Sequence, residues 1–378
     1  MMRIFKLLGL SKIPLVFLAV ILLSAASWGM MATRPAQDEP VVAEAETAPA
    51  VEVEETLLPA HREPPPPPPP APPAPEAPKP AVKAAAKPAP KPKPAPVTVA
   101  AAPAPAPAPA PAGDLGMYGG LGAWVDRFDI IDWQAAIDKM AANGVRTLYF
   151  QTGRYKDPED LFDPARLGHW IDTAHARGIS VVCWYVPGFG DMDRDLRRTR
   201  AALDFVSPGG GRCDGFAPDI ETGDFAGDRA RFNAGVEEYT RRIREVAGGR
   251  VLGAIVVDAK NNERAPGKWA GFPWRAIGEV YDVILPMAYW TVTKGGNCAV
   301  EYDVHSYINQ VIDKTNALMG RARPYHMIGG IANCQTVGET QGFVRAVKER
   351  GLLGGSLYDY VTTQASPHPI WAELGPLR

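Results

Sequence analysis

Two carboxylates spaced two residues apart are the clearest candidates for chemistry in this sequence. Asp219 and Glu221 end the segment 214–221, which reads DGFAPDIE. Alternate side chains of a strand share a face, so both carboxylates point the same way as Ala217. Two carboxylates this close cannot both ionise cheaply in a partly dry cleft, and one pKa rises toward neutrality. The spacing predicts a general acid. The plainer alternative is that one carboxylate pairs with an arginine or caps the next helix.

Aromatic and polar side chains also stand at the ends of other strand-like segments. Aromatic faces stack on the C–H faces of sugar rings while amides and carboxylates bind hydroxyl groups, so this mixture is typical of a cleft for a polar ligand. The alternative is that the tryptophans only fill the core. The predicted ligand-binding residues are Trp124, Asp126, Gln151, Tyr185, Asp258, Trp290 and Tyr358.

Lys260 allows a different class of chemistry. A lysine at the end of a strand forms a Schiff base with a carbonyl substrate when desolvation lowers its pKa. More often such a lysine is solvated or paired with a neighbouring carboxylate, which here is Asp258. The lyase interpretation is therefore the minor one.

The cysteines indicate structural bonds rather than metal binding. Cys298 and Cys334 fall on two loops that we expect to be adjacent, and we predict a disulfide between them. Cys183 and Cys213 flank neighbouring strands and either pair or stay buried as thiols. The chain has no C-x-x-C pair and no H-x-x-x-H spacing. We accordingly predict no metal and no other cofactor.

The charge balance argues against one class of partner. Lys plus Arg number 40 and Asp plus Glu number 42, for a net charge of −2. A dedicated nucleic-acid binder carries a marked excess of positive charge, so we expect no nucleic acid partner. A glycan is the expected ligand, and we expect the protein to be a monomer.

Residues 114–378 alternate strand-like and helical patterns. The predicted helices include 165–177, 228–247, 302–319 and a helix that begins at the capping box of Thr336 and stops at Gly351. The predicted strands are 121–128, 145–154, 179–187, 215–221, 251–260, 283–291, 325–332 and 353–361. Eight strand–helix units in about 250 residues predict an α/β fold, a (β/α)8 TIM barrel, whose active sites lie at the carboxyl ends of the strands. The alternative is an open doubly wound sheet, but its G-x-G-x-x-G fingerprint does not follow the first strand.

The N-terminus, residues 1–32, is predicted to be a membrane anchor. Residues 13–32 form an uncharged run of 20, with Arg3, Lys6 and Lys12 before it and Arg34 after it. That length and charge bias are typical of a single-pass helix whose start stays inside, which places the barrel outside the cytoplasm at the cell membrane. The alternative is a cleaved signal peptide and a secreted protein, since small residues at 24–26 suit a peptidase.

Residues 33–113 are predicted to be a disordered linker rich in Pro, Ala and Lys. Of the 39 prolines in the chain, 27 precede residue 114, and seven of them are consecutive at 64–70. Such a segment buries too little apolar surface to offset its ordering entropy. Extended as polyproline II, residues 59–112 would span about 170 Å. The linker is therefore expected to act as a stiff spacer.

Two short motifs of the predicted barrel resemble those of the chitinase-like family 18 glycoside hydrolases. The octet DGFAPDIE resembles their D-G-x-D-x-D-x-E signature, and MAYW at 287–290 is similar to their M-x-Y-D segment. The resemblance implies that Glu221 protonates the glycosidic oxygen, that Asp219 orients the N-acetyl group of the substrate and that Tyr289 binds its acetamido oxygen. Such substrate-assisted hydrolysis needs no nucleophile from the enzyme.

The sequence departs from the family pattern at four places, one of which is Pro218 in place of an ordinary strand residue. Ala217 replaces the inner Asp of the signature, Trp290 replaces the Asp after the Tyr, and the last strand ends in YDY at 358–360 where the family commonly places Trp. Two interpretations follow. The first is a glycoside hydrolase acting on an extracytoplasmic or cell-wall polysaccharide, a class that includes polysaccharides with N-acetylated sugars. The alternative is a non-catalytic barrel that binds carbohydrate or attaches to the wall.

Overall fold

The computed structural model describes residues 113–378, except 130, 222–224, 226 and 295–297. The predicted anchor, and the predicted linker up to residue 112, lie outside these residues. Within the described part of the chain, no helix is both long enough and apolar enough to cross a bilayer.

The described residues form eight parallel strands that close into a barrel in the order of the sequence. The strands are β1 (Gly120–Val125), β2 (Val145–Arg154), β3 (Ser180–Val186), β4 (Gly215–Ile220), β5 (Gly253–Val257), β6 (Val283–Met287), β7 (His326–Ile331) and β8 (Gly354–Tyr358). The closed ring confirms the predicted barrel and excludes the open sheet.

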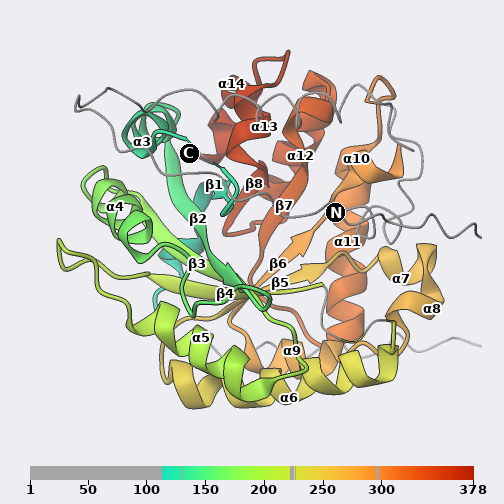
Figure 1. Ribbon diagram of the computed structural model, residues 1–378. Coiled ribbons are helices and arrows are strands. Elements are labelled where there is room, and N and C mark those ends of the chain that lie inside the picture. The colour runs from blue at the N-terminus through green and yellow to red at the C-terminus, as the bar shows by residue number, and fades with distance from the viewer. Residues whose placement is uncertain (1–112, 130, 222–224, 226, 295–297) are drawn as a thin grey trace, which may run out of the picture. The chain divides into compact units, whose positions relative to one another are not determined.

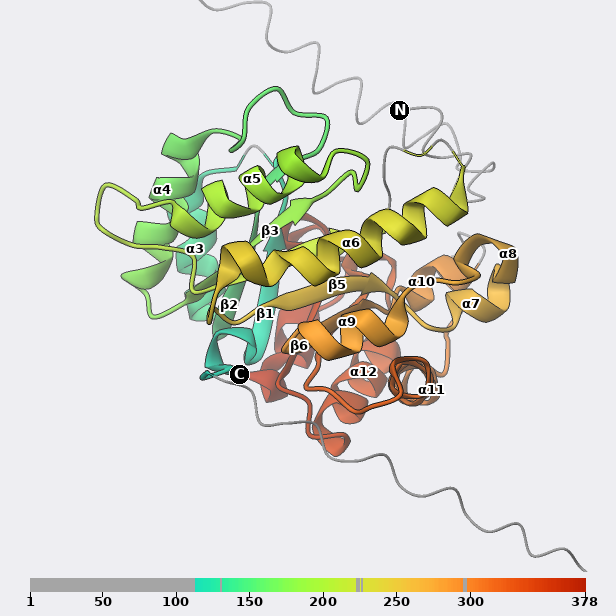
Figure 2. The same cartoon turned by 90° about the horizontal axis from the view of Figure 1, so that it is seen from below.

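Helices surround the barrel on its outside (Figure 1). The longer ones are α3 (Trp133–Ala142), α4 (Pro164–His175), α5 (Met192–Asp204), α6 (Arg229–Ala247), α9 (Trp274–Val280), α11 (Val304–Met319) and α12 (Val337–Glu349). The shorter ones are α7 (Asn261–Arg264), α8 (Pro266–Trp269), α10 (Trp290–Thr293), α13 (Tyr360–Gln364), α14 (Ile370–Glu373) and the 3-10 turns η2 (Gly116–Tyr118), η3 (Ala332–Cys334) and η4 (Gly375–Leu377). Figure 2 shows α6 and α9 side by side on the outside of β5 and β6.

Side-chain caps fix where the long helices begin. The carboxylate of Asp228 accepts a hydrogen bond from the amide of Arg231 at the start of α6, and Asp303 does the same for Ser306 in α11. The predicted capping box of α12 is present, with Thr336 and Glu339 each bonding the backbone of the other. The sequence therefore predicted these starts correctly.

Four predicted strands extend three or four residues too far: β1 ends at Val125 and β5 at Val257, where ends at 128 and 260 were predicted. β6 ends at Met287 and β8 at Tyr358, because the chain then enters the short helices α10 and α13. Asp359 caps α13 by accepting a hydrogen bond from the amide of Thr362 at 2.8 Å. An apolar segment with no break in its pattern does not show where the backbone turns from strand to helix.

Aromatic side chains fill the barrel interior. Tyr118, in the turn before β1, closes the floor by donating a hydrogen bond from its hydroxyl to the carbonyl of Phe216 at 2.9 Å. Glycines face this ring: a β-carbon at Gly253 would come within 2.8 Å of it, and one at Gly215 within 3.0 Å. Above it, Trp124 stacks on Tyr149 with ring centroids 4.2 Å apart.

A chain of hydrogen bonds crosses this interior. Trp124 Nε1 donates to Ser356 Oγ at 2.7 Å, and His326 Nε2 lies 3.0 Å from the same oxygen. His326 Nδ1 lies 2.8 Å from the carbonyl oxygen of Tyr118. A carbonyl only accepts, so Nδ1 carries the proton and Nε2 accepts from the serine hydroxyl. Burial lowers the pKa of His326 to about 4, which keeps the ring neutral.

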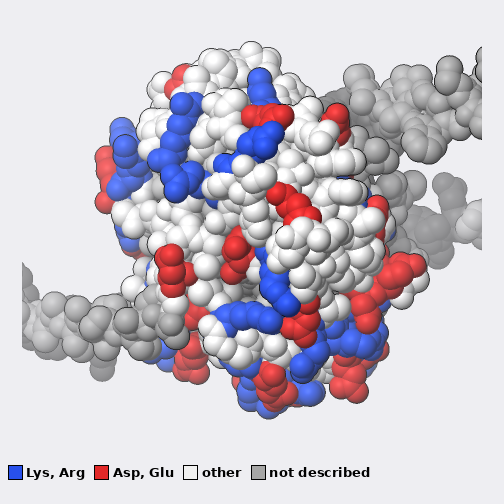
Figure 3. Space-filling view, turned by 90° about the vertical axis from the view of Figure 1, so that its left-hand side faces the viewer, with Lys and Arg blue, Asp and Glu red and all other residues white. Residues whose placement is uncertain are grey.

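Two disulfides join segments on the outside of the barrel. Cys183 of β3 is bonded to Cys213, with Cα atoms 5.7 Å apart. Cys298 is bonded to Cys334, with Cα atoms 4.7 Å apart, which ties the loop after α10 to η3. The surface itself carries mixed charge: Lys and Arg lie among Asp and Glu over the face shown in Figure 3.

Candidate active site

The paired carboxylates lie at the carboxyl end of β4. Ala217 pairs with Trp184 and Phe216 with Cys183 across the β3–β4 ladder, and Trp184 lies inside the barrel with its ring 5.8 Å from that of Trp124. Asp219, two residues beyond Ala217, therefore points inward as predicted. It is 7 % exposed, and its Oδ1 has no hydrogen-bond partner among the described residues. Glu221 lies one residue beyond the strand and is exposed.

The environment raises the pKa of both carboxyl groups. For Asp219 the main cause is burial, and the charge of Glu221 adds to it. For Glu221 the surrounding rim desolvates the carboxyl, while the positive charges of Lys268 and Arg154 oppose the rise. A solvent-accessible acid beside a buried one is the arrangement that general acid catalysis requires.

Two tyrosines lie close to this pair. Tyr289 follows β6, and its ring centroid is 5.8 Å from that of Tyr358 at the end of β8. Burial raises the pKa of Tyr289, and the charges of Glu221 and Asp219 raise it further, so its hydroxyl stays protonated. The structure thus brings the four residues to one rim of the barrel.

Three carboxylates form a second group at the mouth, where β1 and β8 end. The ligand oxygens of Asp126, Asp129 and Asp359 all lie within 4.8 Å of one another, the set of described residues best able to hold a cation. Asp129 also accepts a hydrogen bond from the amide of Asp126 at 3.0 Å. Burial and the charge of Asp126 raise the pKa of Asp129 to about 7. Tyr358 links the group to the tyrosines, since its hydroxyl lies 3.5 Å from Asp126 Oδ2.

The sequence identified only part of that group. Asp126 and Tyr358 were predicted as ligand-binding residues, and both are partly exposed at the mouth. Asp129 was missed because it lies in the loop beyond β1, where the alternation of side chains along a strand no longer predicts which way a residue points. The D-x-x-D spacing of residues 126–129 was the available signal, since an Asp side chain often bonds a nearby backbone amide.

The structure places Trp124 and Trp290, two of the predicted ligand-binding residues, in the core and not at the surface of the mouth. Trp124 is 2 % exposed, and Tyr149 covers its face in the barrel core. Trp290 begins α10 and is fully buried, with its ring centroid 5.6 Å from that of Phe343 of α12. The turn at Tyr289 sends Trp290 outward, away from the mouth.

Tyr185 and Asp258, also predicted to bind a ligand, are bonded to side chains of the surrounding helices. Tyr185 follows the inward-facing Trp184, so it points outward, where its hydroxyl donates a hydrogen bond to Asp195 of α5 at 2.7 Å. Asp258 is 1 % exposed and accepts hydrogen bonds from Tyr307 at 2.7 Å and Arg264 at 3.0 Å. Both residues hold helices to the barrel.

Gln151 and Lys260 are held by neighbouring elements. Gln151 is buried, and its Oε1 accepts a hydrogen bond from the amide of Arg127 at 3.0 Å, so it positions the loop after β1 instead of contacting a ligand. Lys260 Nζ donates to Gln310 of α11 at 2.6 Å and lies 5.1 Å from the ring centroid of Tyr307. These contacts do not support the Schiff-base interpretation.

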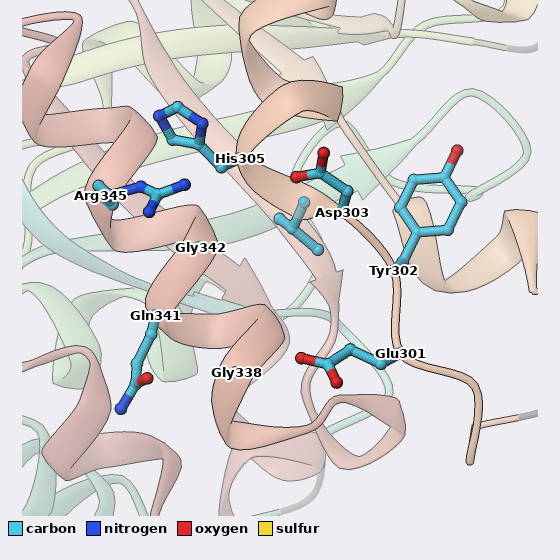
Figure 4. Close-up of a pocket in the computed structure, with 9 residues that line it drawn as sticks. Glu301, Tyr302, Asp303, His305, Gly338, Gln341, Gly342 and Arg345 are labelled. Atoms are coloured by element: carbon cyan, nitrogen blue, oxygen red, sulfur yellow. The ribbon is translucent and has the colours of Figure 1, made fainter.

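A separate pocket lies on the outer wall between the first turns of α11 and α12 (Figure 4). Two side chains that line this pocket already pair with the carboxylate of Glu349. It lies 2.6 Å from His305 Nε2 and 3.9 Å from Arg345 Nε. None of the paired carboxylates or tyrosines of the mouth lines it. The candidate active site is therefore the barrel mouth.

No family of known proteins matches the sequence, and no curated protein matches it. Solved structures share its fold. An endo-1,4-β-D-mannanase from Thermotoga petrophila is 11 % identical with a TM-score of 0.50, and the match covers 64 % of this chain and 88 % of that one. The spore cortex-lytic enzyme SleL of Bacillus cereus is 12 % identical with a TM-score of 0.48, over 68 % of this chain and 74 % of that one. A chitinase from Chromobacterium violaceum is 14 % identical with a TM-score of 0.44, over 68 % and 98 %.

By their names, these structural neighbours act on mannan, on the spore cortex and on chitin. The likeness is one of fold, because fewer than one residue in six is identical. A barrel of this kind supports many chemistries, so the activity has to be argued from the residues at its mouth.

Proposed function

We propose that this protein is a glycoside hydrolase that acts on an extracytoplasmic or cell-wall polysaccharide, with Glu221 as the general acid. The observation that carries the proposal is the placement of Asp219 and Glu221, side by side at the carboxyl end of β4, with a raised pKa for each. Active sites of (β/α)8 barrels lie at this face. Glu221 is the one of the two that is open to solvent and can reach a glycosidic oxygen.

The same geometry suits a sugar that carries an N-acetyl group. Glu221 would give its proton to the leaving oxygen as the acetamido oxygen of the substrate attacks the anomeric carbon. Asp219 Oδ1, which has no partner among the described residues, would accept a hydrogen bond from the N–H of the acetamido group. The hydroxyl of Tyr289 would donate to the acetamido oxygen. Water would then open the cyclic intermediate, with Glu221 taking back the proton.

The substitution at Ala217 has a direct consequence for Asp219. Ala217 is fully buried and its methyl group offers no hydrogen bond. Asp219 Oδ1 is consequently left without a partner among the described residues. A buried unsatisfied oxygen costs free energy, which a polar group of the ligand would recover on binding.

A second candidate function is binding without hydrolysis. It is favoured by Ala217 and by Trp290, two places where the motifs depart from the family pattern and where the residue present carries no carboxylate. On this alternative the mouth holds a glycan and Glu221 only contributes a hydrogen bond.

A glycan cleavage screen separates the two functions. The intact protein, its Glu221→Gln variant and a control variant, Glu237→Gln on the exposed face of α6, are incubated with chitin oligosaccharides, peptidoglycan and mannan, and new reducing ends are measured. We expect the wild type and the control to cleave one of these glycans and Glu221→Gln to be at least 100-fold slower. Binding of a glycan by the wild type without any cleavage would instead establish the binding function.

A further inference from the structure

An extra residue in β2 turns Arg154 toward the barrel mouth. Gln151 pairs with the inward-facing Trp184 of β3, and regular alternation would send Arg154, three residues on, to the outside. The register shifts between Gln151 and Gly153, so that Arg154 pairs with Val186, which lies two residues beyond Trp184 and shares its face. Bulges near active sites commonly redirect a side chain in this way. The β2 bulge therefore places a guanidinium at the mouth.

Arg154 has no ion-pair partner among the described residues. Its backbone amide donates to Asp157 at 2.7 Å, but no carboxylate of the described residues forms a salt bridge with its side chain. The side chain is only partly exposed and lies 6.0 Å from the ring centroid of Phe128. Its charge lowers the pKa of Asp219 and of Glu221, which places it near both.

Two further cations without ion-pair partners among the described residues lie on the same side of the mouth. The positive charge of Lys268 of α8, like that of Arg154, lowers the pKa of Glu221. Its Nζ lies 5.1 Å from the ring centroid of Trp269. Arg229, at the start of α6, stacks over the same ring at 5.0 Å. Burial and the charge of Arg229 lower the pKa of Lys268. Partly desolvated cations favour a nearby anion, so Arg154 and Lys268 attract the carboxylate of Glu221 and would also attract an anionic group of a ligand.

The rim formed by β1 and β8, next to β2, has the reverse character. The carboxylates of Asp126, Asp129 and Asp359 gather where β1 and β8 end. An anionic group would be repelled there and attracted to Arg154 and Lys268 near β2 and β5.

We propose that Arg154 and Lys268 form an anion subsite, which selects a glycan carrying a carboxylate or phosphate on a sugar next to Glu221. The planar guanidinium of Arg154 suits either group, since both present two oxygens to its paired N–H donors. The inference rests on the proposed function for its choice of a glycan as the ligand. It adds the substrate class to that function, an anionic polysaccharide.

Matched pairs of ligands test this subsite. The full-length Glu221→Gln protein, which binds without turnover, is titrated by calorimetry with an oligogalacturonide and its carboxyl-reduced form, and with a phosphorylated mannooligosaccharide and its neutral form. We expect the charged member of at least one pair to bind at least 10-fold more tightly. The pair that shows the preference identifies the anionic group as carboxylate or phosphate.

Adding Arg154→Gln to the Glu221→Gln protein should weaken the binding of the charged ligand only and so abolish the preference. Arg154→Lys keeps the positive charge and should keep part of the preference, which controls for misfolding. Arg200→Gln, on the exposed side of α5, should change nothing. Equal affinity for both members of each pair, no binding of either charged ligand, or a preference that survives Arg154→Gln would overturn the subsite.

The same measurements separate this inference from the proposed function. An Arg154-dependent preference for the charged ligand, with no glycan cleaved by the wild type, would support the subsite and contradict the hydrolase. Cleavage that depends on Glu221 but is indifferent to ligand charge and to Arg154 would support the hydrolase and contradict the subsite.

Discussion

At the residue scale, the two carboxylates of β4 differ in their contact with water, and this difference assigns their roles. Asp219 is buried while Glu221 is exposed, although only two positions separate them. The charge of Glu221 helps to raise the pKa of Asp219. We therefore expect Glu221→Gln, which removes that charge, to lower the pKa of Asp219. A carbon-13 NMR titration of the carboxyl groups measures this, and an unchanged Asp219 would mean that the two groups do not interact.

His326 predicts how stability depends on pH. Its folded pKa of about 4 lies below the unfolded value near 6.5, so protons bind more tightly to the unfolded chain. The contribution is complete above pH 6.5 and falls as the pH drops from 6.5 to 4, by on the order of 3 kcal/mol. Urea unfolding of the wild type and His326→Gln across this range checks the prediction. An equal slope in both proteins would contradict it.

Side-chain direction decided which candidate residues the sequence could place. Alternation of side chains along a strand predicted that Asp219 and Glu221 point into the mouth, because both lie at the end of an uninterrupted strand. The same rule should have separated Tyr185 from Trp184, since neighbours on a strand face opposite sides. Trp290 could not be placed, because its direction depends on a turn into α10 that the apolar pattern does not reveal.

At the scale of elements, a buried ion pair connects α10 to α12. Lys294 Nζ lies 2.6 Å from Glu339 Oε2, both side chains are inaccessible to solvent, and the amine also donates to the carbonyl of Cys334 at 3.2 Å. Glu339 is at the same time the capping-box residue of α12. The pair therefore anchors the loop after β6 to the helix after β7.

Removing one partner of this pair should be costly. We expect Lys294→Met to lower the free energy of unfolding by about 3–5 kcal/mol, because a buried carboxylate is left uncompensated. Lys348→Met, on the exposed side of α12, should change it by less than about 0.5 kcal/mol. Denaturant unfolding compares the two variants, and a loss below 1 kcal/mol for Lys294→Met would argue against the coupling.

The order and spacing of the strands and helices could be predicted from the sequence, but their local irregularities could not. Eight apolar segments separated by amphipathic helices implied the closed barrel, and the capping box gave the start of α12. The bulge between Gln151 and Gly153 leaves no mark in the composition, because it arises from pairing with β3. The unpaired Arg154 could therefore be recognised only after the register was known.

At the scale of the whole molecule, we propose that residues 13–32 anchor the chain in the membrane and that the proline-rich linker sets the reach of the barrel. Shortening the linker by removing residues 64–111 should then reduce function in cells and leave the unfolding temperature and glycan turnover of the purified protein unchanged. A Gly/Ser segment of the same length is the matched control for stiffness. Full cellular function after the deletion would remove the support for a tether.

The central claim is that Glu221 acts as the general acid at the mouth of the barrel. The most direct test measures kcat on the first glycan that the wild type cleaves, for the wild type, Glu221→Gln and the exposed control Glu237→Gln. We expect a loss of about 10²–10⁴ in kcat for Glu221→Gln, with the control within twofold of the wild type. Glycan cleavage by Glu221→Gln at the wild-type rate would contradict the account.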